Sequence, residues 1–180
     1  VTVTAGTTYY IMVDTWPDPN CSKFDINISE CPQGMSCAMP KTIPSLPFSE
    51  TNTTCGAGAD YGALVGTDYA VCGPAMNDDG ADFTYAYTPT RNQCLNISLS
   101  GIPAHKEDMS VVVTQGCPTS ASSKCLALSE GSGTAGPPNI TDLYVLAGST
   151  IYITIDADDF YFSCTPFTLT IDTCALFLPQ

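Results

Sequence analysis

Positive charge is scarce in this sequence. Five Lys and Arg residues stand against 18 Asp and Glu residues in a chain of 180, which gives a formal net charge of −13. A field of this sign repels nucleic-acid phosphates and anionic lipid headgroups, so we expect no nucleic-acid partner. Long apolar runs are missing too, because none reaches the roughly 20 residues with which a helix spans a bilayer. We therefore expect no membrane insertion.

The residue types that catalysis most often uses are also scarce. The single histidine, His105, lies in the polar stretch "IPAHKED" (102–108), and no G-x-S-x-G motif occurs. A catalytic nucleophile needs a base beside it, and a histidine in a polar loop does not supply one. The stretch "GAGADYG" (56–62) looks like a phosphate loop, but Asp60 would repel an anion and no helix follows. The sequence therefore predicts that the chain is not an enzyme.

Cysteine, in contrast, is abundant. The chain has ten cysteines, of which none forms a C-x-x-C pair, and only one histidine that would complete a zinc site. This usage is typical of disulfides formed in an oxidising compartment. The sequence therefore predicts an extracellular or cell-surface protein.

Helical periodicity is absent, and a strand pattern takes its place. Apolar and polar residues alternate with a period of two in 24–28, 83–87 and 95–99. Such segments form strands with one buried and one wet face. Turn-forming residues separate them at 16–20, 77–80, 116–125 and 131–139. We predict an all-β fold, an antiparallel β-sandwich.

A sequence echo links the two ends of the chain. "AGTTYYIMVD" (5–14) returns as "AGSTIYITID" (147–156), with six of ten positions identical. The match continues when the offset between the two copies is increased by one residue, so that 21–31 aligns with 164–174. The aligned pairs are Cys21 and Cys164, Phe24 and Phe167, Ile26 and Leu169, Ile28 and Ile171, and Cys31 and Cys174. The sequence thus predicts three parts: residues 1–30 as the C-terminal β-hairpin of a preceding or neighbouring copy of the fold, 31–42 as a linker, and 43–180 as a complete sandwich domain.

The hairpin of residues 1–30 needs something to pack against, because an isolated two-stranded hairpin is marginal in water. Its apolar face, which we predict to be an assembly interface, consists of Tyr9, Ile11, Val13, Phe24, Ile26 and Ile28. Burying six such side chains is worth on the order of 10 kcal/mol. Two accounts follow: a longer tandem chain supplies the other strands, or the hairpin inserts into a neighbouring copy and builds a head-to-tail filament.

Disulfide pairing is only partly predicted by spacing. Cys117 and Cys125 close a short loop between two strands, and Cys31 and Cys37 flank a short Pro/Gly segment, so both are predicted bridges. Cys164 and Cys174 cannot pair, because a strand between them would hold them on the order of 30 Å apart. The predicted remainder, Cys55, Cys72, Cys94 and Cys164, pair among themselves in one of three connectivities.

Ligands and modifications are suggested by two kinds of motif. The cluster "NDDGAD" (77–82) predicts Ca²⁺ at Asp78, Asp79 and Asp82, with a solvated turn as the alternative, and no other cofactor is expected. N-x-Ser/Thr triplets allow a glycan at Asn20, Asn27, Asn52, Asn96 and Asn139.

Several stretches together follow a known pattern. They are "TTCGAGADYG" (53–62), "DDGADFTYAYTP" (78–89), "CLNISLSG" (94–101), "VVVTQGCP" (111–118) and "LAGSTIYITID" (146–156), together with 5–28. In order and spacing they resemble the bacterial pre-peptidase C-terminal domain, in the cysteine-containing form of large secreted proteins. The resemblance implies a jelly-roll-like sandwich and a non-catalytic module, often found in tandem beside secreted peptidases and adhesins.

These observations lead to one functional hypothesis and one alternative. We predict a non-catalytic extracellular structural module that builds a fibre or surface appendage, by tandem repetition or by strand exchange, with other copies of itself as head-to-tail partners. The alternative is a glycan- or protein-binding accessory module of a secreted adhesin or peptidase. In that case exposed aromatic residues such as Trp16 and Tyr161 would make the contacts.

Overall fold

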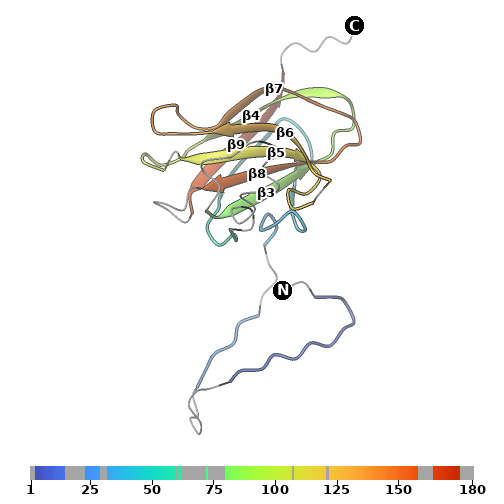
Figure 1. The fold of residues 1–180 in the computed structure, drawn as a ribbon, viewed down its shortest axis with the longest axis vertical. Coiled ribbons are helices and arrows are strands. Elements are labelled where there is room, and N and C mark those ends of the chain that lie inside the picture. The colour runs from blue at the N-terminus through green and yellow to red at the C-terminus, as the bar shows by residue number, and fades with distance from the viewer. Residues whose placement is uncertain are drawn as a thin grey trace. The chain divides into compact units, whose positions relative to one another are not determined.

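The computed structural model of the chain separates into two units, Val1–Glu30 and Cys31–Gln180 (Figure 1). The residues that the structure describes are 3–14, 23–28, 32–59, 61, 72, 80–106, 108–120, 122–157 and 164–174. Each unit is described below by itself. Within the described residues there is no helix long and apolar enough to span a bilayer.

The second unit contains two β-sheets, as predicted for a sandwich, and all the regular elements among its described residues are strands. They are β1 (Lys41–Thr42), β2 (Phe48–Thr53), β3 (Asp82–Tyr87), β4 (Gln93–Ser100), β5 (Met109–Gln115), β6 (Lys124–Glu130), β7 (Asn139–Val145), β8 (Ile151–Ala157) and β9 (Pro166–Thr173). One sheet has the order β1-β3-β8-β5-β6 and the other β2-β9-β4-β7. Every pairing is antiparallel except that of β1 with β3. A jelly-roll topology stays a prediction.

The core lies between the two sheets and is built by the predicted alternation. Phe83, Tyr85 and Tyr87 point inward from β3 and are at most 8% exposed. On β4, residues 95, 97 and 99 are buried, while 96 and 98 between them are half-buried. Four aromatic rings gather at the centre, where Phe167 of β9 lies edge-on to both Phe83 and Tyr85.

The outer face of the five-stranded sheet is buried as well, which corrects the prediction of a wet face on β3. Asp82 and Thr84 of β3, Thr154 and Asp156 of β8 and Ser110 of β5 are all 0% exposed. The reason is a covering layer, in which Tyr61 and Cys72 pack on Val112 of β5. Period-two alternation in the strands cannot foresee a loop that folds back over the polar face.

Residues 32–42, predicted to be a linker, belong to the sandwich. Lys41 and Thr42 form β1 beside β3. The Thr84 N–H donates to the Gly34 carbonyl at 2.7 Å, and Gly34 has a φ of 95°. A Cβ at Gly34 would overlap the Phe83 ring, so this close approach requires glycine. A Pro- and Ser-rich composition indicates irregular backbone, but it does not tell whether that backbone is a free linker or, as here, packs on the sandwich.

Among the described residues of the first unit, 3–14 and 23–28, there is no strand, so the β-hairpin stays a prediction. The exposed fractions of its side chains nevertheless alternate along the chain. Tyr9, Ile11 and Val13 are 48–62% exposed, whereas Tyr10 and Met12 between them are 90–95% exposed. Two strands without a third partner or a packed face are marginal, which accounts for the missing ladder.

Candidate functional site

Four disulfides staple the second unit. They join Cys37 to Cys117, Cys55 to Cys164, Cys72 to Cys125 and Cys94 to Cys174. As strand length requires, Cys164 and Cys174 at the two ends of β9 have different partners. The Cys55–Cys164 bridge lies within the predicted set of four cysteines.

The other predicted pairings are wrong. Cys117 and Cys125 do not pair with each other, because Cys125 lies opposite Thr114 in the β5–β6 ladder and thus out of register with Cys117. The predicted Cys31–Cys37 bridge is excluded because Cys37 is bound to Cys117.

Cys72 and Cys94, predicted to pair within the set of four, have partners outside it. Cys125 takes Cys72 from the covering layer, and Cys174 takes Cys94. Spacing along the chain does not foresee partners that tertiary folding brings from far away.

Tyr61 is the anchor of the covering layer, and the sequence analysis missed it. Its hydroxyl accepts the Cys37 N–H at 2.9 Å and lies 3.2 Å from Thr84 Oγ1, while its own N–H donates to Asp82 Oδ2 at 3.1 Å. One side chain thus joins three segments of the chain. The available signal was a lone aromatic residue within the otherwise small and polar stretch 56–62.

Two carboxylates lie side by side beneath that layer. Asp82 and Asp156 are directly opposed in the β3–β8 ladder, and both are fully buried. Asp82 is one of the three residues of the predicted Ca²⁺ site. Asp78 and Asp79 lie outside the described residues, so that site stays a prediction.

Another group of potential metal ligands is unsuitable. Cys94, Asp142 and Cys174 have ligand atoms within 4.8 Å of one another. Because the two cysteines are joined in a disulfide, neither offers the thiolate that a metal binds. This cluster is therefore structural.

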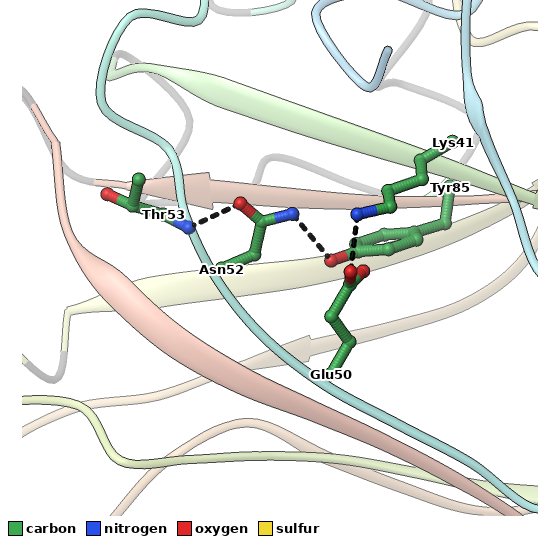
Figure 2. Close-up of polar contacts among 5 residues, drawn as sticks. All are labelled: Lys41, Glu50, Asn52, Thr53 and Tyr85. Carbon is green, nitrogen blue, oxygen red and sulfur yellow. Dashed lines mark hydrogen bonds and ion pairs between the residues drawn. The ribbon is translucent and has the colours of Figure 1, made fainter. Parts of the chain in front are cut away.

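A polar network lies at the open edge of the sandwich, where β1 and β2 are the edge strands of the two sheets (Figure 2). Lys41 Nζ forms an ion pair with Glu50 Oε1. Asn52 Nδ2 donates to the Tyr85 hydroxyl at 3.3 Å, and the Thr53 N–H donates to Asn52 Oδ1 at 2.9 Å. Figure 2 shows the Lys41 amine, the Glu50 carboxylate and the Asn52 amide gathered around the Tyr85 hydroxyl.

Tyr85 is the buried member of this network. Burial raises the pKa of its hydroxyl above the ordinary tyrosine value, the hydrogen bond from Asn52 lowers it, and the nearby Glu50 carboxylate raises it again. Tyr85 is fully buried, and Phe48 packs edge-on against its ring at 6.0 Å between centroids. The polar groups of this network therefore lie against an apolar wall.

The exposed apolar side chains of the first unit are a second candidate site. They belong to the predicted assembly interface: Tyr9, Ile11, Val13, Phe24, Ile26 and Ile28 are between 48% and 74% exposed. Their counterparts in the echo are Ile151, Ile153, Ile155, Phe167, Leu169 and Ile171, of which none is more than 1% exposed. The same pattern is therefore core in one place and surface in the other.

That correspondence also changes how residues 1–30 are interpreted. The counterparts lie on β8 and β9, which belong to different sheets and do not pair with each other. β8 lies between β3 and β5, and β9 lies between β2 and β4. Residues 5–14 and 23–28 therefore correspond to one central strand of each sheet rather than to the two strands of a hairpin.

The remaining predicted residues are scattered. His105 is exposed in the loop before β5, with a φ of 69°. Among the N-x-Ser/Thr asparagines, Asn27 and Asn139 are exposed, and Asn52 and Asn96 are half-buried. Asn20, Trp16 and Tyr161 lie outside the described residues.

A half-open cleft of about 540 Å³ lies beside the loop 44–47. Its lining includes Arg91 and Asp172, and Gln93, which donates to the Tyr87 hydroxyl at 2.6 Å. Among the described residues this lining includes no cysteine or histidine.

Comparison with known proteins found a structural similarity. No family model and no curated protein matches the sequence. Among solved structures, the chain is similar to the pre-peptidase C-terminal domain of collagenase from Bacillus anthracis, with 11% sequence identity and a TM-score of 0.46. The match covers 73% of this chain and 93% of the collagenase chain. Membership of that family stays a prediction, and the fold is taken here from the strand order and register alone.

Proposed function

We propose that the chain is an extracellular, non-catalytic structural module in which residues 5–28 complete a sandwich other than that of residues 41–173. Modules joined in this way form a fibre or surface appendage. The observation that carries the proposal is the contrast between six apolar side chains at least 48% exposed in the first unit and their six counterparts at most 1% exposed in β8 and β9.

The energetic reason is the apolar surface of residues 5–28. Leaving six large side chains in water forfeits on the order of 10 kcal/mol that burial would return. A contiguous exposed apolar surface is also a general mark of an interaction site. The partner that fits is a sandwich of the same fold whose β8 and β9 positions are vacant.

The need for vacant β8 and β9 positions favours one of the two routes, a longer tandem chain or insertion into a neighbouring copy, over the other. In the sandwich of residues 41–173 both positions are filled, and each strand is hydrogen-bonded on both sides. A segment from a neighbouring copy would have to displace both β8 and β9. The Cys55–Cys164 and Cys94–Cys174 disulfides hold β9 in place at its two ends. We therefore favour a tandem array, in which the acceptor strands come from a further sandwich of the same polypeptide, over donation into an identical copy.

The disulfides suit a module that carries tension. Cys37 and Cys174 lie near the two ends of the second unit, and each is cross-linked to the interior, to Cys117 and Cys94 respectively. The shortest covalent path between these ends runs through only the 23 residue-to-residue steps from 94 to 117, whereas the backbone from 37 to 174 has 137 steps. Such pairing places the load on covalent bonds in an oxidising, extracellular setting.

Fragment complementation tests the proposal. Residues 32–146, which lack β8 and β9, are refolded under oxidising conditions with a synthetic peptide of residues 1–31. We expect a folded complex in which Cys21 is linked to Cys55 and Cys31 to Cys94, because these cysteines correspond to Cys164 and Cys174.

The controls define the result. A peptide of residues 147–180 is the native positive control, and the 1–31 peptide with Ile11→Asp and Ile26→Asp is the matched negative control. If the native peptide restores the fold and the 1–31 peptide does not, residues 5–28 do not fill the β8 and β9 positions and the proposal fails.

A further inference from the structure

We propose that the side chains of Lys41 and Asn52 become joined by an intramolecular amide bond. Glu50 transfers the protons in this reaction, and the bond links β1 and β2, the edge strands of the two sheets. The proposal concerns the polar network of Figure 2 and is independent of what residues 1–30 bind.

The fold brings the reacting groups to one place. Lys41 lies beside Tyr85 in the parallel β1–β3 ladder, so its side chain leaves the sheet on the same face as the Tyr85 ring. Glu50 and Asn52 are two residues apart on β2 and therefore share one face of that strand. The amine thus comes from one sheet, and the carboxylate and the amide come from the other.

Each group has the partner that acyl transfer requires. The Lys41 amine is the nucleophile, and its contact with Glu50 Oε1 gives the ammonium proton an acceptor. The Asn52 carbonyl oxygen already accepts a hydrogen bond from the Thr53 N–H at 2.9 Å, which stabilises the negative charge that develops there during attack. The Asn52 nitrogen, the leaving group, is held by the Tyr85 hydroxyl at 3.3 Å.

The reacting groups are partly shielded from water. The side chains of Lys41 and Glu50 are 33% and 25% exposed, and the fully buried Tyr85 forms the wall behind them. Glu50 Oε2 is buried and has no hydrogen-bond partner among the described residues. Water is therefore partly excluded from the place where the amine, the carboxylate and the amide meet.

The reaction balances without a co-reactant. Glu50 removes one proton from the Lys41 ammonium, and the neutral Nζ attacks Asn52 Cγ. The Cγ–Nδ2 bond of the tetrahedral intermediate then breaks, while Glu50 passes to the departing nitrogen the proton that it holds and then a second proton from Nζ. One Nζ–Cγ amide bond has formed, one C–N bond has broken, and one ammonium ion leaves.

Intact mass of the folded full-length chain, reduced before injection, is the primary test. We expect a mass lower than that of the sequence by one ammonia molecule. Proteolytic cleavage after Glu50 separates Lys41 from Asn52 in the backbone, so the two resulting peptides remain joined only if the amide exists. Detection of that branched peptide locates the bond.

Variants distinguish this reaction from other losses of ammonia. Lys41→Arg and Glu50→Gln should fold, as checked by circular dichroism, and should keep the full sequence mass. Asn52→Asp should still react, with loss of water in place of ammonia. Lys124→Arg, which changes an exposed lysine outside the network, is the matched control and should show the same deficit as the wild type.

Several results would overturn the proposal. A folded wild-type chain with the full sequence mass would do so, as would a deficit that persists in Lys41→Arg. A glycan on Asn52, which lies in an N-x-Thr triplet, would also contradict it, because the glycan would occupy the nitrogen that must leave.

Discussion

Residues 5–28 and residues 147–171 share the same alternation of apolar and polar side chains, but the apolar side chains are exposed in the first segment and buried in the second. In β8 and β9 the pattern is fully buried, and each strand has a hydrogen-bonded neighbour on both sides. In the first unit the same pattern forms no strand among its described residues, and its apolar side chains are exposed. The difference teaches that the pattern encodes a central strand only when both flanking strands are present.

The comparison predicts first that a charge is fatal in one region and harmless in the other. Ile153→Asp would bury an unpaired carboxylate at a site that is 0% exposed, and we expect it to abolish folding, with a loss of more than about 4 kcal/mol. Ile11→Asp, the matched change at a site that is 62% exposed, should alter the stability of the sandwich by less than about 0.5 kcal/mol. Urea unfolding of both variants measures the contrast. Equal destabilisation would mean that the first unit packs on the sandwich of its own chain.

A second prediction concerns extension under force. When the chain is pulled from positions 37 and 174, the path of 23 residue-to-residue steps from 94 to 117 limits the extension to about 80 Å at roughly 3.5 Å per residue. After reduction all 137 steps extend, to about 480 Å. Single-molecule force spectroscopy with and without reductant checks this. A long extension without reductant would show that these disulfides do not limit unfolding.

The third prediction pairs two phenylalanines. Phe167→Ala removes a fully buried ring from the aromatic centre of the core and should cost about 3–5 kcal/mol. Phe24→Ala, at the corresponding position of the first unit, should leave the thermal midpoint of the sandwich unchanged because Phe24 is 59% exposed. Calorimetry of the two variants distinguishes core from surface at matched positions of the echo.

The smallest expected effect is a pH dependence from Tyr85. Burial raises the pKa of its hydroxyl, so the folded state favours the neutral phenol. This contribution is complete below the ordinary tyrosine pKa of about 10 and is lost as the pH rises above it. Tyr85→Phe should therefore lose less stability than the wild type between about pH 10 and 12, as measured by denaturant unfolding. An identical alkaline loss in both proteins would contradict this assignment.

The sheets and their inward residues were predictable from the sequence because alternation reports the face that each side chain occupies. For 95–99 the predicted inward residues are the buried ones, and for 83–87 they are buried together with Thr84 of the outer face. The covering layer was not predictable, since Tyr61 lies in a segment without periodicity and its burial depends on Cys37, Asp82 and Thr84. Non-local contacts of this kind leave no mark in the local pattern.

In the candidate sites, too, local patterns were predictable from the sequence and non-local contacts were not. The apolar face of residues 5–28 followed from the echo, but the pairing of its two segments as a hairpin stays a prediction, because the echo preserves strands and not their pairing. The disulfides were mispredicted where short loops suggested local bridges. The Lys41, Glu50 and Asn52 network was invisible in sequence because β1 and β2 are edge strands of different sheets that meet only in three dimensions.

The most direct test of the account is disulfide mapping by mass spectrometry on the native protein, with attention to Cys21 and Cys31. The account predicts that Cys21 is linked to the cysteine at the Cys55 position of another sandwich, and that Cys31 is linked to the one at the Cys94 position. A bridge between Cys21 and Cys31 themselves, or two free thiols, would contradict the claim that residues 5–28 complete a second sandwich.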